Sequence, residues 1–320
     1  MDAPGSPSLG SPHRQVKTSG RREEFLLRLL DKLWERYRSR VSYVRTYEDV
    51  VRRAGGAFVN DHIAFRTLAC QKPSAGIFSV SRIFEALGYA PAASYFFPDK
   101  RLEATHYQHP TPGFPKLFVS ELHTWELSSK GNAVVLKSLR GHRPPLADAV
   151  LAACREADKA SAPAAAKLLG TLMDHFSELP WPMPQKSDVV ALNEESQYAA
   201  WVLVRGYDVN HFTASVNSHG VESLGDIEKT VGALRHAGVP MKTAIEGERG
   251  SKLRQSATEA VVTDVSVKQG SKTVKMPWPY AYCEIAERGM SVDPDTGTAK
   301  RFEGFLGGQA SQLFEMTRRK

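Results

Sequence analysis

AFVNDHIAFRTLA (residues 57–69) is an apolar, β-prone run with one histidine, His62, embedded in it. Such a composition is typical of a buried strand. A second run of this kind, DVNHFTASVN (208–217), carries His211. The two runs predict equivalent strands in the two halves of the chain.

The residues after each run strengthen this repeat. Each strand is followed by apolar residues at helical spacing and then by a glycine that ends the helix, 26 residues after His62 and 27 residues after His211. Further strand-like runs follow in both halves, at 94–97, 102–108, 116–127, 241–245, 253–264, 272–276 and 280–287. The pattern predicts an α+β fold of two paired βαβββ modules that form one curved, mixed sheet.

The rest of the chain divides around these modules. Residues 1–22, rich in Ser, Pro and Gly, are predicted to be a disordered tail, and an amphipathic helix is predicted over 23–41. Two Ala/Leu-rich helices are predicted around 145–157 and 164–179. We therefore expect a single catalytic domain with these parts: module one at about 23–135, a helical insertion at about 141–184 and module two at about 198–320.

Composition and charge exclude several classes of protein. The 320 residues are 42% hydrophobic and 24% charged, as in an ordinary globular protein. Residues 1–22 and 318–320 each contribute +3 to the net charge of +7, so the body is nearly neutral and nucleic acid is not an expected partner. No apolar run reaches the ~20 residues of a membrane helix. The three scattered cysteines predict a reducing, intracellular location, in the cytoplasm or in an organelle such as a plastid or mitochondrion.

Two histidines at matched places in a repeat indicate a metal site more strongly than one does. Pseudo-twofold symmetry would bring His62 and His211 together, and a glutamate from a closing strand, Glu121 or Glu284, would complete the set. Two imidazoles and one carboxylate form the set that holds Fe(II) on one face. The spacing alone does not choose between the two glutamates, or between iron, manganese and zinc.

Three further residues are candidates for substrate binding. Arg66 shares strand parity with His62, so its guanidinium is expected beside the metal, where it could hold a substrate carboxylate. An ion pair with an acid of the second half is the alternative. Arg254 and Gln255, in a strand-like run after a glycine-rich turn, could reach the same cavity or lie on a solvated edge.

Four motifs, taken in order, resemble one known family. DHIAFRT, VNHFTASVN, LRQSATEA and YCEIAERG, with a closing FEGFLGGQASQLFE, are similar to the 2-oxoadipate dioxygenase/decarboxylases, also called hydroxyglutarate synthases. That family belongs to the vicinal oxygen chelate superfamily, which has paired βαβββ modules. The resemblance implies His62, His211 and Glu284 as metal ligands and Arg66 as a contact of the substrate carboxylate.

The resemblance also implies a reaction. It points to an Fe(II) oxygenase of lysine catabolism that converts 2-oxoadipate and O₂ to 2-hydroxyglutarate and CO₂. The expected partners are a 2-oxo dicarboxylic acid and O₂, with no nucleic acid and no membrane. A metal-dependent isomerase or lyase on the same scaffold, and a non-catalytic binding or regulatory protein, are the alternatives.

Overall fold

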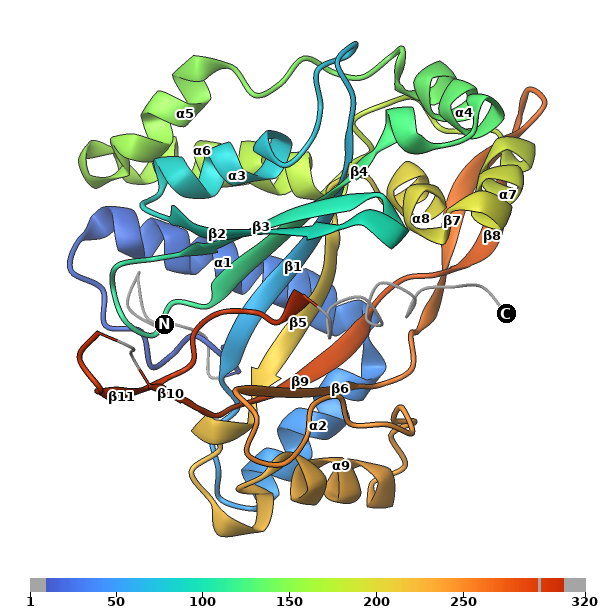
Figure 1. The fold of residues 1–320 in the computed structure, drawn as a ribbon. Coiled ribbons are helices and arrows are strands. Elements are labelled where there is room, and N and C mark those ends of the chain that lie inside the picture. The colour runs from blue at the N-terminus through green and yellow to red at the C-terminus, as the bar shows by residue number, and fades with distance from the viewer. Residues whose placement is uncertain (1–9, 293–294, 308–320) are drawn as a thin grey trace.

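The computed structural model describes residues 10–292 and 295–307, and a curled, mixed sheet of seven strands lies at its centre (Figure 1). The sheet strands are β1 (Asn60–Ala69), β2 (Ala90–Phe97), β3 (Leu102–Gln108), β4 (Lys116–His123), β5 (Val209–Ser215), β6 (Leu253–Ala257) and β9 (Tyr282–Arg288). Their order is β2-β3-β4-β1-β5-β9-β6. The two halves of the chain meet where β1 pairs with β5 in antiparallel fashion.

The two halves of the sheet repeat one another about this central pair. β1 pairs with β4 in parallel and is followed by α3 (Phe78–Ala86), while β5 pairs with β9 in parallel and is followed by α9 (Ile227–His236). In the second half, Met241 forms a bridge to Thr258, just after β6, and Glu246 forms a bridge to Gln255 in β6. The segment 241–246 thus lies beside β6 as β2 lies beside β3. The predicted α+β fold of paired βαβββ modules is confirmed.

One predicted strand of the second half is divided. The strand-like run 253–264 leaves the sheet after Ala257, the last β6 residue paired with β9. The next two strands, β7 (Val262–Gln269) and β8 (Lys272–Pro279), pair with each other in a separate hairpin, and a single bridge joins Lys268 of β7 to Gln185. Because β7 and β8 satisfy each other's backbone groups, this segment needs no place in the main sheet.

Helices surround the sheet on several sides. They are α1 (Arg21–Arg40), α2 (Ser42–Arg53), α4 (Ser129–Leu139), α5 (Asp148–Arg155), α6 (Ala162–Ser177), α7 (Lys186–Glu195) and α8 (Gln197–Arg205). The predicted N-terminal helix is α1, and the two predicted helices of the insertion are α5 and α6. α5 packs on α3 and α6 packs on α1, outside the sheet (Figure 1).

The helix α8 was not predicted, although it is the most buried of the described helices. All nine of its residues are buried, and the indole of Trp201 donates a hydrogen bond to the carbonyl oxygen of Tyr280 at 2.6 Å. A short helix that is apolar all round has no amphipathic period to reveal it. Its packing against β1 and β7 fixes the helix, and this packing is not visible locally.

The N-terminal segment corrects another prediction. Residues 1–9 lie outside the described residues, but the disorder predicted for the tail is wrong over 10–22, because residues 21 and 22 belong to α1 and residues 10–20 precede it in an ordered segment. The buried ring of His13 lies 2.9 Å from Asp31 of α1 and 3.2 Å from the side-chain amide of Asn60 at the start of β1. One buried imidazole with two partners orders a polar stretch that composition alone marks as flexible.

We expect His13→Ala to lower the free energy of unfolding by about 1–3 kcal/mol, because Asp31 and Asn60 each lose their hydrogen bond to the buried imidazole. Urea denaturation monitored by circular dichroism measures this loss. The matched control is Arg14→Ala, since Arg14 is exposed, and it should change stability by less than about 0.5 kcal/mol. Equal stability of the His13 variant and the wild type would contradict the docking of this segment.

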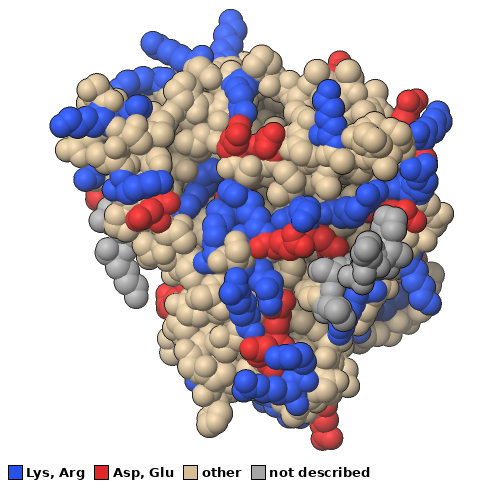
Figure 2. Space-filling model, turned by 180° about the vertical axis from the view of Figure 1, so that it is seen from behind, with Lys and Arg blue, Asp and Glu red and all other residues tan. Residues whose placement is uncertain are grey.

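The surface carries mixed charge. In Figure 2, basic and acidic side chains lie interspersed over the face that is shown. Among the described residues, no helix combines the length and the apolar character that crossing a membrane requires.

Candidate metal centre

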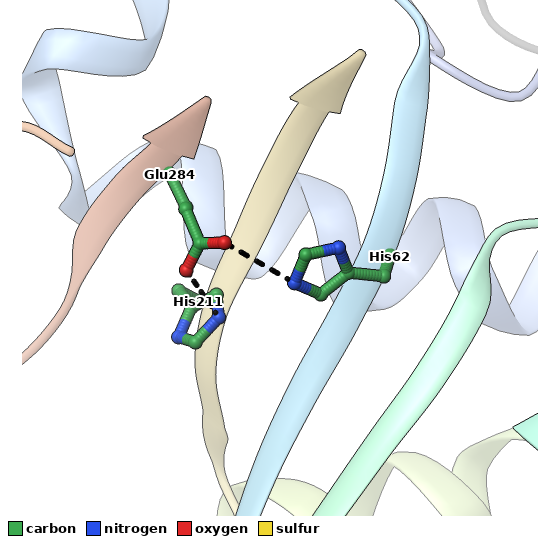
Figure 3. Close-up of side chains that lie close together, drawn as sticks. All are labelled: His62, His211 and Glu284. Carbon is green, nitrogen blue, oxygen red and sulfur yellow. Dashed lines mark ion pairs between the residues drawn. The ribbon is translucent and has the colours of Figure 1, made fainter. Parts of the chain in front are cut away.

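Three side chains from neighbouring strands point toward one another at the centre of the sheet (Figure 3): His62 from β1, His211 from β5 and Glu284 from β9. His62 Nε2 lies 3.5 Å from Glu284 Oε1, and His211 Nε2 lies 3.1 Å from Glu284 Oε2. One ligand atom from each residue lies within 4.8 Å of the others. Atoms bonded to one metal at about 2.1 Å and at right angles lie about 3 Å apart, so the spacing suits a shared ion.

The residue before each histidine fixes its ring. His62 Nδ1 donates to Asp61 Oδ2 at 2.8 Å, and His211 Nδ1 donates to Asn210 Oδ1 at 2.9 Å. Because both acceptors are oxygens, each neutral ring carries its proton on Nδ1 and its lone pair on Nε2. Both lone pairs are therefore directed toward the centre of the triad, where the Thr213 hydroxyl lies 2.9 Å from His62 Nε2 and would give up this contact to a bound metal.

The ionised carboxylate of Glu284 gives the triad a negative charge that a bound cation would balance. Burial lowers the pKa of His211, so its ring is neutral. Burial opposes ionisation of Glu284, but the adjacent His211 and His62 and the Gln255 amide outweigh it and lower the pKa of the carboxyl. The fully buried Glu284 Oε2 has no hydrogen-bond donor in the described structure, and it faces the lone pair of His211. A divalent ion would satisfy both atoms, so the residues present fit a metal.

The strand register separates Glu284 from Glu121. Glu284 lies opposite Thr213, two residues after His211, and the equivalent place in the first half is Phe118, opposite Ala64. Glu121 comes three residues later, at odd parity, and its carboxylate accepts a hydrogen bond from the backbone N–H of Ile77 at 2.7 Å. The structure thus brings Glu284 to the histidines and turns Glu121 away. Phe118 leaves the fourth symmetric position without a ligand atom.

A small cavity adjoins the triad. Its volume is about 30 Å³, and it is lined by His62, Ala64, Phe65, Arg66, Phe118, Ser120, Asn210, His211, Gln255, Tyr282, Glu284, Phe305 and Leu306. A larger cavity of about 270 Å³ lies between α3, α5 and α6, where the ring of His175 is bonded to the carbonyl oxygen of Ser79 at 2.8 Å. His62, His211 and Glu284 line the smaller of the two cavities.

Arg66 lies in the cavity wall, as its strand parity predicts. It is 2% exposed, and its guanidinium carbon lies 5.0 Å from the ring centre of Tyr198 and 5.5 Å from that of Trp201. The aromatic rings of α8 thus hold a cation beside the triad.

The two neighbours Arg254 and Gln255 point to opposite sides of β6. Gln255 lines the cavity, and its amide donates a hydrogen bond to Glu284 Oε1. Arg254 binds both carboxylate oxygens of Glu228, at 2.9 and 2.6 Å, and lies 3.6 Å from Glu287. Side chains alternate along a strand, so Arg254 cannot reach the cavity with Gln255, and the substrate contact predicted for Arg254 is wrong.

Comparison with known proteins identifies the family. Residues 29–312 match the sequence model of a family described as 2-oxoadipate dioxygenase/decarboxylase. The chain belongs to the 2-oxoadipate dioxygenase/decarboxylase family. The resemblance noted in the sequence motifs is thereby confirmed.

Two plant members of this family are similar over most of the chain. The chloroplastic/amyloplastic 2-oxoadipate dioxygenase/decarboxylase of Oryza sativa subsp. japonica is 29% identical over 318 residues, which cover 92% of this chain and 79% of the rice protein. The chloroplastic 2-oxoadipate dioxygenase/decarboxylase of Arabidopsis thaliana is 30% identical over 278 residues, covering 80% of this chain and 67% of that protein.

Solved structures share the fold. A glyoxalase superfamily protein of Ralstonia eutropha JMP134 has a TM-score of 0.78 at 23% identity, over 94% of this chain and 96% of that chain. The hydroxyglutarate synthase of Oryza sativa, in complex with 2-oxoadipate, has a TM-score of 0.75 at 26% identity, over 99% of this chain and 97% of that chain. The curled sheet of paired modules is thus common to this family and to a glyoxalase superfamily protein.

The sequence analysis did not predict several residues that surround the site of this dioxygenase/decarboxylase family member. Asp61 and Asn210 had a visible signal, because an oxygen-bearing side chain precedes the histidine in both halves, in DH and in NH. Burial would raise the pKa of Asp61, but the ion pair with Arg288 outweighs it and holds the pKa well below its usual range. Arg288 and Phe305 lie within the YCEIAERG and FEGFLGGQASQLFE motifs, but their contacts with the site were not predicted, because they reach it from the end of β9 and from the segment beyond it.

Proposed function

We propose that this chain is an Fe(II)-dependent dioxygenase/decarboxylase that converts 2-oxoadipate and O₂ to 2-hydroxyglutarate and CO₂. One observation carries the proposal: the buried convergence of His62, His211 and Glu284 from three neighbouring strands, with the two Nε2 atoms 3.5 and 3.1 Å from the carboxylate oxygens. The two plant relatives bear the name of this activity, and the rice hydroxyglutarate synthase binds 2-oxoadipate in its crystal structure.

The proposed ligands suit iron. Two histidines and one carboxylate are typical of non-haem Fe(II) oxygenases, in which the remaining coordination positions are open to substrate and O₂. When bound, the iron would supply the O₂ chemistry and a Lewis acid that polarises the 2-oxo acid. Phe118 at the fourth symmetric position supports this assignment because it adds no protein ligand.

The chain's own residues would bind the substrate and protect the reaction. The Arg66 guanidinium is the cation that would hold the second carboxylate of 2-oxoadipate, which the metal cannot hold. Phe118 and Phe305 would exclude water from the cavity wall. Asp61 and Asn210 would keep the two rings in the tautomer that ligates.

The overall reaction is balanced. 2-Oxoadipate loses its carboxyl carbon as CO₂, one oxygen atom of O₂ becomes part of the new carboxylate, and the other becomes the hydroxyl of 2-hydroxyglutarate. The substrate supplies the reducing electrons, so no second 2-oxo acid is consumed.

An anaerobic titration with Fe(II), followed by O₂ and a panel of 2-oxo acids, tests the proposal. We expect one Fe(II) per chain, equal amounts of O₂ consumed and CO₂ released with 2-oxoadipate, and 2-hydroxyglutarate labelled from ¹⁸O₂. The Zn(II)-loaded protein is the control, because zinc fits similar ligands but has no redox chemistry. Product without O₂ uptake would indicate an isomerase or lyase, and the absence of metal binding would indicate a non-catalytic protein.

The remaining proposals concern context. The shared sheet supports our view of residues 23–320 as a single catalytic domain, and the substrate class fits a role in lysine degradation. The exclusion of nucleic acid and membrane as partners stays a prediction. So does the intracellular location, in the cytoplasm or an organelle, although both plant relatives are described as chloroplastic.

A further inference from the structure

The chain beyond β9 crosses back over the metal centre. After the hairpin of β10 (Met290–Val292) and β11 (Ala299–Arg301), residues 302–307 form a segment that we call the strap (Figure 1). The ring of Phe305 lies 4.8 Å from that of His62 and 4.8 Å from that of Phe118, measured between centroids. The strap thus forms one wall of the cavity.

The strap is fastened to the first module as well. The backbone N–H of Phe305 donates to the Tyr95 hydroxyl at 3.1 Å, and the Gln108 amide donates to the carbonyl oxygen of Glu303 at 3.3 Å. The carboxylate of Glu303 also forms an ion pair with Lys116. A segment that follows the last strand of module two is therefore held against β2, β3 and β4.

One buried side chain connects the strap to the metal centre. Arg288, 4% exposed, donates from Nε and Nη2 to the two carboxylate oxygens of Asp61 at 2.6 and 2.7 Å. Its third nitrogen, Nη1, donates to the carbonyl oxygens of Phe302 at 3.1 Å and Gly304 at 2.8 Å. The planar guanidinium fork thus holds a carboxylate on one side and two strap carbonyls on the other.

Asp61 carries this connection to the metal centre. The Oδ2 atom that accepts from Arg288 also accepts from His62 Nδ1 at 2.8 Å. A displacement of the strap would move Arg288, then Asp61, and then the imidazole of His62. The route consists of hydrogen bonds and one ion pair; the contacts of Asp61 with Arg288 and His62 are buried, and those of Arg288 with the strap carbonyls are partly buried.

The cavity beside the metal centre is too small to hold the proposed substrate. A volume of about 30 Å³ is far below the roughly 300 Å³ at which ligand pockets begin. A six-carbon dicarboxylic acid can therefore enter only if a wall moves. Among the described residues that line the cavity, Phe305 and Leu306 of the strap are the ones that lie outside the strands of the sheet.

We propose that Arg288 is a positioning residue that couples closure of the strap to the orientation of His62. The inference rests on the metal centre proposed above. When the strap is closed, Arg288 holds Asp61 and fixes the lone pair of His62 toward the metal. When the strap opens to admit substrate, that support loosens.

Metal binding tests the proposal directly, with Co(II) as a spectroscopic probe. Arg288→Gln and Arg288→Lys are expected to weaken Co(II) binding by about 10- to 100-fold and to shift its visible absorption bands, as loss of an outer-shell partner of a metal-ligating histidine does. The matched control is Arg254→Gln, which breaks another two-pronged arginine–carboxylate contact, partly buried and on the opposite side of β6, and should change neither quantity.

A substitution away from the metal centre tests whether the strap and His62 are coupled. Tyr95→Phe removes the hydrogen bond that fastens Phe305 of the strap to β2, together with the contact of the Tyr95 hydroxyl with His106 at 2.9 Å. In the described structure, the Tyr95 hydroxyl has no hydrogen bond with Asp61 or the triad. It should weaken Co(II) binding by roughly 3-fold or more in the wild type, and have no such effect in the Arg288→Gln background. Equal effects of Tyr95→Phe in both backgrounds, or wild-type Co(II) binding by Arg288→Gln, would overturn the coupling.

The result can be separated from a failure of the proposed function. Metal binding and O₂ turnover by the wild type, together with unchanged Co(II) binding by the Arg288 variants, would refute the coupling alone. Metal binding without O₂ uptake on 2-oxoadipate would refute the function alone, since the Co(II) measurements still decide the role of Arg288. No Co(II) binding by the wild type would refute both. If Arg288→Gln does not fold, wild-type Co(II) affinity in Tyr95→Phe is the overturning result.

Discussion

Replacing Glu284 by glutamine is expected to abolish metal retention and to reduce turnover by at least about 1,000-fold. Loss of an outer-shell partner already costs about 10- to 100-fold in metal affinity or activity, and this change removes a direct donor of negative charge. The glutamine has nearly the same shape, so the packing of β9 is retained. Metal content after gel filtration and O₂ uptake with 2-oxoadipate measure the two losses.

Stability separates this effect from misfolding. Ligand at 100 times its dissociation constant stabilises a protein by about 2.7 kcal/mol, so the wild type should melt at a higher temperature with metal than without it. Glu284→Gln should show no such rise when metal is added, whereas a variant that is merely destabilised but still binds metal should show it.

Glu121→Gln is the matched control for Glu284→Gln. Glu121 lies in the equivalent strand of the first module, but its carboxylate binds the backbone N–H of Ile77 outside the site. This variant should keep its metal and its activity. Equal loss of metal in the two variants would contradict the assignment of the carboxylate ligand.

Replacing Arg66 by alanine is expected to leave metal binding intact and to lower kcat/KM for 2-oxoadipate by at least about 10-fold. A charge-assisted hydrogen bond contributes about 1.5–3 kcal/mol, and each 1.4 kcal/mol corresponds to one factor of ten. The distal carboxylate of the substrate would enter a nearly dry cavity without its cation. Steady-state O₂ uptake over a range of substrate concentrations measures the loss.

A second substrate shows which carboxylate Arg66 holds. A monocarboxylic 2-oxo acid of similar length lacks the distal charge, so its kcat/KM should fall much less in the variant. Arg66→Met fills more of the space beside Tyr198 and Trp201 and controls for lost packing. Equal losses for both substrates would mean that Arg66 supports the fold or binds the C1 carboxylate.

The sequence predicted the parts of the site that depend on local pattern. The two strands around His62 and His211 are readable because a buried, β-prone run is a property of consecutive residues. Strand parity placed Arg66 on the side of His62, and both residues line the cavity. The same parity separates Arg254 from Gln255, but it does not say which of the two points inward.

The register between strands could not be predicted from the local sequence pattern. The choice between Glu121 and Glu284 depends on how far β4 and β9 slide along their parallel partners, and a shift of one residue turns a side chain to the other face. Family motifs supplied this choice at the sequence level. In the structure, the register supplies it independently.

The longest connections were decided by the tertiary structure alone. Arg288 meets Asp61 across 227 residues of chain, and His13 meets Asn60 across 47. Such pairs form because a buried charge or imidazole is stable only when it is hydrogen-bonded. Its partner can come from any part of the chain that lies nearby in the fold, so no spacing in the sequence predicts the pair. The sequence by itself determined the repeated strands and the residues able to bind a metal. Only the tertiary structure decided which carboxylate joins the histidines and which segment closes over them, because both depend on contacts between distant parts of the chain.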